Sequence, residues 1–286
     1  MVNIKKSVLS SVLKKFLMAI TGFVLASFLL IHMLGNLQTF EGGPHAINAY
    51  AHTLQTLPWE ILWGFRLTLL ACFAIHFLTA YMLVVENGRS RPQQYAVKKS
   101  LSSSLAARTM IYSGTVVIAF AVLHILHFTV LNLDPDFKIL EWVATAGIYE
   151  GKTLHDVYAM LIMGFSNPWV ACGYIFAMIV IAFHLSHGVS SMFQSVGLRN
   201  EAWRYRLNAI AVAYCVVIAA GFSLNPLAVM VSKYTDCEIL PVKRVLRQIE
   251  AQKAAGAGEI FVDYGFLCGK AAKCGASAAA KPEAKK

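Results

Sequence analysis

Five apolar blocks alternate with polar segments along the chain. They cover about residues 16–37, 60–85, 110–133, 168–193 and 207–231, and each contains few or no charged side chains. A helix needs roughly 20 mostly apolar residues to cross the hydrocarbon core of a bilayer. Because a helix satisfies its own backbone hydrogen bonds in lipid, each block predicts a membrane-spanning helix. The pattern therefore predicts an all-α integral membrane bundle of five transmembrane helices.

Two of the polar segments have features of their own, the 134–167 loop and the tail from residue 235. In the 134–167 loop, a polar stretch is followed by a run that predicts a short surface helix at about Leu154 to Met163, lying as a cap over one face of the membrane. From residue 235 the chain becomes rich in Lys, Ala and Gly, with one amphipathic helix expected near Val242 to Gln252 and little to bury. We therefore expect a five-helix domain over 1–234 and a polar tail over 235–286, disordered over its last dozen residues.

The composition supports a membrane protein and argues against other classes. Of the 286 residues, 57% are hydrophobic and 14% are charged, whereas soluble domains carry about 25% charged residues. The net charge of +10 comes from loops and the tail, which argues against a nucleic-acid partner. The six cysteines show no metal-ligand spacing and predict neither a zinc site nor a disulfide framework, and Cys237, Cys268 and Cys274 in the tail have no predicted role.

Basic residues orient the bundle. The N-terminus, the 86–109 loop and the 194–206 loop contain four, five and three Lys or Arg residues, whereas the 38–59 loop contains none and the 134–167 loop only two. Cytoplasmic loops carry the excess of Lys and Arg. The N-terminus is therefore expected in the cytoplasm and the C-terminus outside, with lipid around the bundle.

Histidines lie at two depths inside the predicted spans. An imidazole in a membrane span needs a partner or a function. His32 and His124 fall in the outer halves of the first and third spans. His76 and His184 each come 16 residues after the outer start of a span, ~24 Å down. Any single one could be a neutral histidine hydrogen-bonded between helices, but four different helices carry these four.

Two imidazoles at one level on facing helices are what a haem iron with two axial ligands requires. The depths pair His32 with His124 and His76 with His184, which predicts two b-type haems forming an electron path across the membrane. His127 and His187 each follow one of these residues by three positions, on nearly the same helix face. Spacing alone leaves them as alternative ligands.

Sequence stretches around these histidines carry a resemblance to a known family. They are KKFLMAITG and LIHMLGNLQ in the first span, INAYAHTLQTLP in the first outer loop, IHFLTAY in the second span, ARTMIYSGTVVIAFAVLHILHF in the third and FHLSHGVSSMFQSVG in the fourth. Over about residues 14–230 the chain resembles the cytochrome b membrane-anchor subunit of succinate:quinone oxidoreductases and quinol:fumarate reductases, the five-helix type with two haems. The tail from about 235 lies outside this resemblance.

The resemblance implies a set of ligands, partners and substrates. The axial histidines of the family fall on His32, His76, His124 and His184, and the family's glycine ten residues before the third ligand matches Gly114. The resemblance also implies a flavoprotein and an iron-sulfur subunit on the cytoplasmic face, a quinone, commonly menaquinone, as substrate, and allows a higher oligomer. The dicarboxylate chemistry of succinate dehydrogenase or fumarate reductase would lie in those partners, so no catalytic residue is expected in this chain.

Further polar residues are candidates for contacts with the haem propionates and the quinone. Arg66 lies at a depth close to His32 and could pair with an outer propionate or reach to the membrane interface. For the inner haem the candidates are Arg108, Ser191 and Gln194. A quinone site is predicted beside the outer haem, with candidate contacts at Asn36, His45, Asn48, Tyr50 and His52, and less favoured ones at Asp156 and Tyr158.

Two other functions remain open from the sequence. A di-haem anchor of another respiratory oxidoreductase, such as formate dehydrogenase or nitrate reductase, would share the haems but have different partners. A small transporter could line a proton or metal path with the same histidines and would carry no chromophore.

Overall fold

Five long helices form the body of the molecule. The structure, a computed structural model, describes residues 9–90 and 104–270. The long helices are α1 (Ser11–Leu37), α3 (Trp59–Arg89), α5 (Met110–Phe128), α7 (Pro168–Ser195) and α8 (Glu201–Tyr234). Each is long and apolar enough to cross a membrane, which confirms the predicted all-α bundle of five spans and a multi-pass membrane protein. Below, "outer" is the end of the bundle that the charge pattern assigns to the outside.

The third span ends earlier than predicted. We expected it to reach residue 133, but α5 ends at Phe128. After the helix, the N–H groups of Val130 and Asn132 donate to the carbonyls of Ile125 and Leu126, and Leu131 has a positive φ of 57°. The apolar residues from Val130 to Leu133 therefore lie beyond the helix, in the segment that leads into the outer part of the protein.

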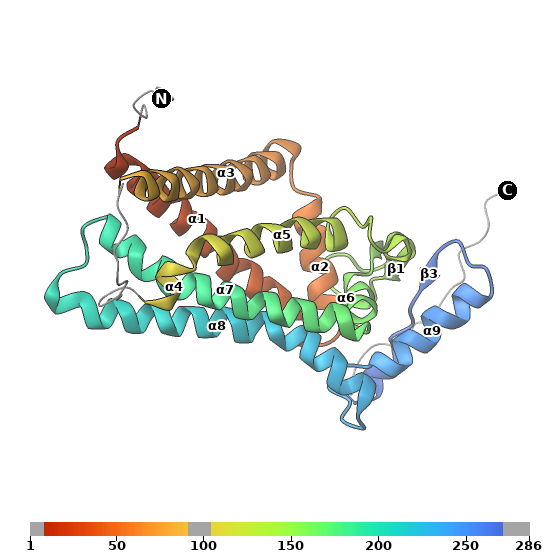
Figure 1. Ribbon diagram of the computed structural model, residues 1–286. Helices are drawn as coiled ribbons and strands as arrows, with labels where there is room; N and C mark the ends of the chain where they lie inside the picture. Colours follow the sequence, from red (N-terminus) through yellow and green to blue (C-terminus); the bar gives the residue numbers. More distant parts are fainter. Residues whose placement is uncertain (1–8, 91–103, 271–286) are drawn as a thin grey trace.

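The helices pack in a defined order (Figure 1). α7 and α8 pack against each other, α1 contacts α3, α7 and α8, and α5 packs on α7. α3 contacts mainly α1 and touches α5 sparsely. The centre of the bundle is an apolar cluster in which Met33 of α1 and Ile218 of α8 are almost fully buried among side chains of α7.

The ends of the bundle carry exposed aromatic side chains. Trp59 and Trp169 lie at the outer ends of α3 and α7, and Trp203, Tyr205 and Tyr112 lie at the inner ends of α8 and α5. Trp and Tyr are enriched where a membrane meets water, because their rings are amphipathic. Their positions support insertion of the five helices into a bilayer.

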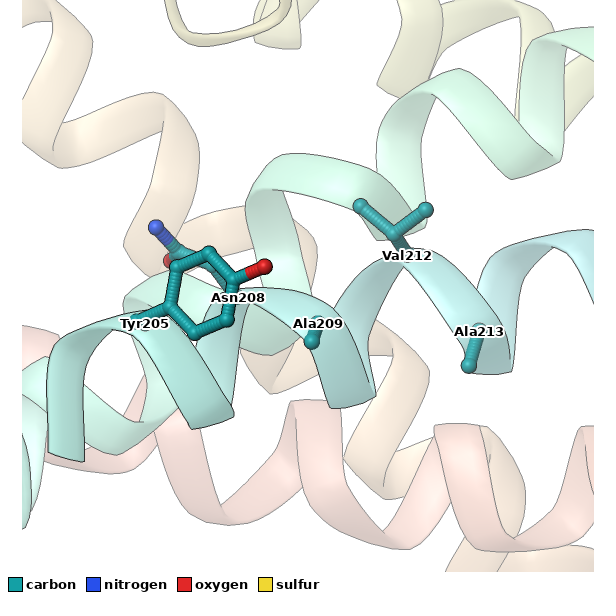
Figure 2. Close-up of a pocket in the computed structure, with 5 residues that line it drawn as sticks. All are labelled: Tyr205, Asn208, Ala209, Val212 and Ala213. Carbon is teal, nitrogen blue, oxygen red and sulfur yellow. The ribbon is translucent and has the colours of Figure 1, made fainter.

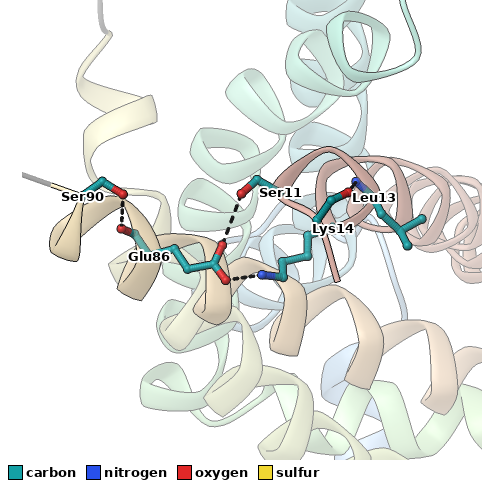
Figure 3. Close-up of polar contacts among 6 residues, drawn as sticks. Ser11, Leu13, Lys14, Glu86 and Ser90 are labelled. Atoms are coloured by element: carbon teal, nitrogen blue, oxygen red, sulfur yellow. Dashed lines mark hydrogen bonds and ion pairs between the residues drawn. The ribbon is translucent and has the colours of Figure 1, made fainter. Parts of the chain in front are cut away.

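One ion pair joins two spans at the inner end (Figure 3). Lys14 of α1 is fully buried, and its ammonium group contacts the Glu86 carboxylate of α3, which also accepts from Ser11. A buried ammonium is costly unless a counter-charge and hydrogen bonds accompany it. The pair therefore fixes the inner end of α3 against α1.

A second compact part, the outer cap, covers the outer end of the bundle. We use this name for α2 (Pro44–Gln55) after η1 (Gln38–Phe40), the 134–167 segment, and the chain after α8 as far as residue 267. These segments contribute η2 (Pro135–Ile139), β1 (Leu140–Val143), β2 (Thr153–His155), α6 (Val157–Phe165), α9 (Val242–Ala254), β3 (Ile260–Phe261) and η3 (Gly265–Lys270), whereas the short helix α4 (Leu105–Arg108) lies at the inner end.

A small sheet, which the sequence analysis did not predict, holds the outer cap together. Its strand order is β2-β1-β3. β1 and β2 pair antiparallel, with Trp142 opposite Leu154, and β1 and β3 pair in parallel, with Leu140 opposite Ile260. The C-terminal segment is thus part of the same sheet as the second outer loop.

Two expectations for the outer cap were wrong. The region of Leu154 to Met163 is not a surface helix: it begins as β2 and continues as α6, in which Ala159 and Ile162 are fully buried. A helix that is apolar on all sides becomes buried rather than amphipathic.

The tail was expected to bury little, but α9, β3 and the residues beside them contribute to the apolar core of the cap, with Leu240, Val242, Val245, Ile249, Ile260, Val262 and Tyr264. The expected helix near Val242 to Gln252 is confirmed, and the last dozen residues lie outside the described ones.

A buried carboxyl group joins the three segments of the outer cap. Asp156 is fully buried, and its Oδ1 accepts from Asn48 Nδ2 at 3.0 Å and from the Ala159 N–H at 2.9 Å. Its Oδ2 accepts from the Tyr264 hydroxyl at 2.8 Å. Asn48, itself fully buried, accepts from the Tyr158 N–H at 2.9 Å. We call Asn48, Asp156 and Tyr264 the polar hub, because α2, α6 and the C-terminal segment meet there.

The first prediction concerns close packing of α1 and α8. A Cβ atom added at Gly221 would lie 2.2 Å from Met33 Sδ and 2.8 Å from its Cγ. Since Met33 is buried, Gly221→Ala should destabilise the bundle by about 1–3 kcal/mol, as overpacking does. Gly173→Ala, with no atom within 4 Å of the new Cβ, is the matched control. Thermal unfolding in detergent measures both, and equal melting temperatures would contradict the prediction.

The second prediction concerns the pH dependence of the outer cap. Burial raises the pKa of the Asp156 carboxyl from 3.8 to about 6, although the hydrogen bonds it accepts oppose the shift. Because the folded state then binds the proton more tightly than the unfolded state, the stabilisation is complete below about pH 4 and is lost as the pH rises towards 6, by up to about 3 kcal/mol.

Asp156→Asn keeps the shape of the side chain and, like the protonated carboxyl group, offers one acceptor oxygen and one donor group, but it cannot titrate. The variant should therefore lose this part of the pH dependence, measured between pH 4 and pH 7 by hydrogen exchange of residues 240–264. Asp263→Asn, at an exposed position of the same segment, should keep it. An unchanged pH profile in Asp156→Asn would show that the carboxyl does not titrate as stated.

Candidate functional site

The outer histidines approach each other between α1 and α5. The ring centroids of His32 and His124 are 5.8 Å apart, with the rings at 74°. When two imidazoles bind the same metal ion from opposite sides, each through a nitrogen at about 2 Å, their ring centroids are roughly 6 Å apart. Phe28 and Phe222 lie beside His32, at 5.3 and 5.6 Å, and Phe120 lies 5.8 Å from His124. The surroundings of this pair are thus aromatic and apolar.

The inner histidines lie on α3 and α7, each held by the neighbouring helix. His76 Nδ1 lies 3.1 Å from the Met18 carbonyl and 3.3 Å from Thr21 Oγ1, both on α1. His184 Nδ1 lies 3.1 Å from Ser113 Oγ on α5. His76 is within electrostatic reach of His184. The structure thus places the rings of His32 and His124 next to each other, and His76 and His184 lie on α3 and α7 within range of an electrostatic interaction.

Glycines make room beside the inner imidazoles. A Cβ atom on Gly22 would lie 3.1 Å from His76 Cε1, and one on Gly114 would lie 3.4 Å from His184 Cε1. Each glycine directly follows the hydroxyl residue that contacts the same histidine. A larger side chain at Gly22 would push the His76 ring away from α1, so this position needs glycine for the close approach.

The donor set fits a haem better than a metal ion held by protein alone. Among residues 9–90 and 104–270, no group of three or more His, Cys, Asp or Glu side chains could hold a metal ion. Two facing imidazoles suffice for haem, because the porphyrin supplies the other iron ligands. His124 Nδ1 is buried without a hydrogen-bond partner in the described chain, and all four histidines are only partly covered by protein. These features leave nitrogen atoms free to bind a planar cofactor.

The alternative ligands are engaged elsewhere. His127 is 8% exposed, its Nδ1 lies 3.0 Å from the Tyr174 hydroxyl, and its ring stacks on Phe137 of the outer cap at 5.3 Å. His187 is half-buried towards the inner end of α7. The contacts of His127 support His124 as the ligand on α5. Tyr174, which the sequence analysis did not single out, also lies in ring contact with His124 at 6.0 Å.

The candidate propionate contacts lie at both ends of the bundle. Arg66 is exposed, and its guanidinium group lies over the Trp63 ring at 5.4 Å. Arg108 is exposed at the end of α4. Gln194 accepts from Arg199 Nη1 at 3.2 Å, which adds a cation that the sequence analysis did not assign to this region. Ser191 is half-buried on α7, one turn after His187.

The candidate quinone contacts separate into three groups. Asn36 and Tyr50 lie closest to the outer histidines: Asn36 Nδ2 is 2.8 Å from the His32 carbonyl and 3.4 Å from His32 Nε2. The Tyr50 ring lies against Gly35, where a Cβ would be 2.6 Å from the hydroxyl oxygen. The other residues face the cap: His45 and His52 pack on Trp142 and Tyr149, while Asn48, Asp156 and Tyr158 belong to or adjoin the polar hub.

A shallow depression on α8 lies outside this site (Figure 2). It is lined by Tyr205, Asn208, Ala209, Val212 and Ala213, near the inner end of the helix. None of the histidines lines it. At its edge, Arg199 Nη2 donates to Asn208 Oδ1 at 3.4 Å.

Comparisons of the chain with protein-family models, curated proteins and solved structures find no significant match. The feature of the chain that points most clearly to a function is the set of four histidines on four membrane-spanning helices.

Proposed function

We propose that the chain is a membrane-anchor cytochrome b subunit, which carries electrons between an iron-sulfur partner and quinone through two bis-histidine b haems. The observation that supports this most strongly is the pairing of His32 with His124 and of His76 with His184 from four helices. Haem would supply one-electron redox chemistry at the two pairs. The chain would contribute the axial nitrogens, an apolar environment and the separation of the pairs along the bundle.

The protein environment suits electron transfer at these positions. If both imidazoles of a pair held one haem iron, they would leave no open coordination position, and oxygen binding would be disfavoured. Phe28, Phe120 and Phe222 exclude water from the outer pair. The inner pair lies nearer the basic inner end, where Arg108, Arg199 and Arg204 offer positive charge to a soluble partner. We expect that partner to be the iron-sulfur subunit, itself joined to a flavoprotein.

The direction of electron travel favours a quinone site at the outer end. Haems at two depths are useful when electrons must cross from the inner face to a reactant near the outer face. Asn36 contacts His32, and Tyr50 lies against Gly35, three residues further along α1, so a quinone oxygen could exchange hydrogen bonds and protons there. The proposal includes menaquinone as the substrate, succinate oxidation or fumarate reduction in the partner subunits, and the cytoplasmic membrane of a prokaryote as the location.

The third prediction concerns the haems. The purified chain should contain two b-type haems, since each pair of imidazoles supplies two axial ligands. His76→Ala and His184→Ala should each remove the same spectral component, and His32→Ala and His124→Ala should each remove the other. Pyridine haemochrome analysis and redox titration of the α-bands count and separate the two. His127→Gln and His187→Gln are the matched controls and should keep both.

Other outcomes of that experiment distinguish the alternatives. A fully loaded chain with one haem or none would reject the proposal, and the absence of a chromophore would favour a histidine-lined transporter. Loss of one shared component in the His32 and His76 variants would show that the pairing is wrong. Two haems without a co-purifying flavin, or without reduction by succinate, would favour the anchor of a different respiratory enzyme.

The fourth prediction places the quinone site. Tyr50→Phe removes only a hydroxyl group beside Gly35 and should lower quinone-linked turnover about tenfold, the loss expected for about 1.4 kcal/mol of transition-state stabilisation. Both haems should remain, and succinate oxidation by an artificial acceptor should be unchanged. Tyr149→Phe, which removes an exposed hydroxyl group that contacts Thr53 Oγ1 at 3.0 Å, is the matched control. If Tyr50→Phe, Asn36→Ala and His52→Gln all keep quinone turnover while changes at Arg108 or Ser191 abolish it, the site lies at the inner end.

A further inference from the structure

Each inner histidine meets a buried hydroxyl group from the neighbouring helix. Thr21 and Ser113 are 4% and 7% exposed, and their oxygens lie 3.3 and 3.1 Å from Nδ1 of His76 and His184. These contacts join residues 55 and 71 positions apart in the sequence. The same local arrangement therefore occurs twice, between α1 and α3 and between α5 and α7.

The hydrogen of each hydroxyl group is already used within its own helix. Thr21 Oγ1 donates to the Leu17 carbonyl at 2.7 Å, and Ser113 Oγ donates to the Met110 carbonyl at 3.1 Å. A hydroxyl group has one hydrogen and can otherwise only accept. With their hydrogens bonded to these carbonyls, both oxygens act as acceptors towards the histidines.

These hydrogen bonds favour one tautomer for both inner histidines. If Thr21 and Ser113 accept, Nδ1 of His76 and of His184 must carry the proton. The Met18 carbonyl, which also contacts His76 Nδ1, can only accept, so it requires the same tautomer. A neutral imidazole protonated at Nδ1 has a free electron pair on Nε2, which is the form that binds a metal through Nε2.

The outer histidines lack this arrangement. His124 Nδ1 is buried without a partner among residues 9–90 and 104–270, and His32 is contacted at Nε2 by the Asn36 amide, at 3.4 Å. Nothing in the described chain fixes a proton on Nδ1 of either ring. Preorganisation is thus a property of the inner pair.

We propose that Thr21 and Ser113 are positioning residues, which hold His76 and His184 in the Nδ1-protonated form with Nε2 directed to the iron of the inner haem. This inference rests on the proposed function. A hydrogen bond from Nδ1–H to an oxygen makes the imidazole a stronger electron donor. A stronger donor stabilises ferric over ferrous iron, so these two residues lower the reduction potential of the inner haem.

The test compares variants of the haem-loaded protein. Ser113→Ala should raise the potential of the inner haem and shift its low-spin electron paramagnetic resonance signal, with the outer haem unchanged. Thr21→Val should have a smaller effect, because the Met18 carbonyl still accepts from His76. Ser113→Thr should restore the original values. Thr115→Val, whose hydroxyl donates only to the Ile111 carbonyl of its own helix, is the matched control and should change neither haem.

The outcomes separate this inference from the proposed function. If Ser113→Ala keeps both haems with unchanged potentials and signals, or if Thr115→Val shifts them equally, the positioning role is wrong while the cytochrome proposal stands. If the wild-type chain binds no haem, the cytochrome proposal fails, and ¹⁵N nuclear magnetic resonance of labelled histidine decides the positioning. His76 and His184 protonated at Nδ1, with a mixture in Ser113→Ala, would then support it, and protonation at Nε2 in the wild type would overturn it.

Discussion

The cost of placing imidazole groups in a hydrocarbon environment shapes the interior of this protein. A polar ring in lipid must find partners, and four of the spans carry such rings at matched depths. At the inner level, each ring contacts a hydroxyl group and lies close to a glycine of the next helix. At the outer level, the rings face each other among phenylalanines, and one ring nitrogen stays without a partner in the described chain. The neighbouring helices thus provide the surroundings of all four imidazole side chains.

The arrangement has a consequence for how the bundle holds together under the proposed function. α3 packs mainly on α1, while its histidine lies within range of an electrostatic interaction with the histidine of α7. Ligation of one iron by His76 and His184 would join α3 to α7, and ligation of another by His32 and His124 would join α1 to α5. Two cofactors would then connect helices whose direct contacts are few, in the case of α3 above all.

The outer cap depends on a different interaction, the burial of Asp156. Its carboxyl group accepts hydrogen bonds from α2 and from the C-terminal segment, so the two outer loops and the chain after α8 share one polar hub and one apolar core. The same cap positions Tyr50 against Gly35 of α1, three residues after His32. The cap therefore links the C-terminal segment, which lies outside the family resemblance, to the end of the bundle where the quinone site is proposed.

The sequence by itself determined the features that depend on local composition and periodicity: the five spans follow from apolar blocks of sufficient length, and α9 from apolar residues at 242, 245 and 249. The positions of the histidines along the spans predict their pairing. Contacts between distant segments were decided only by the tertiary structure. The sheet of the cap, the burial of α6 and the partners Thr21 and Ser113 each depend on which helix faces which. Sequence spacing carries no information about that, because hydrogen bonds and packing between remote segments are set by the whole arrangement of helices.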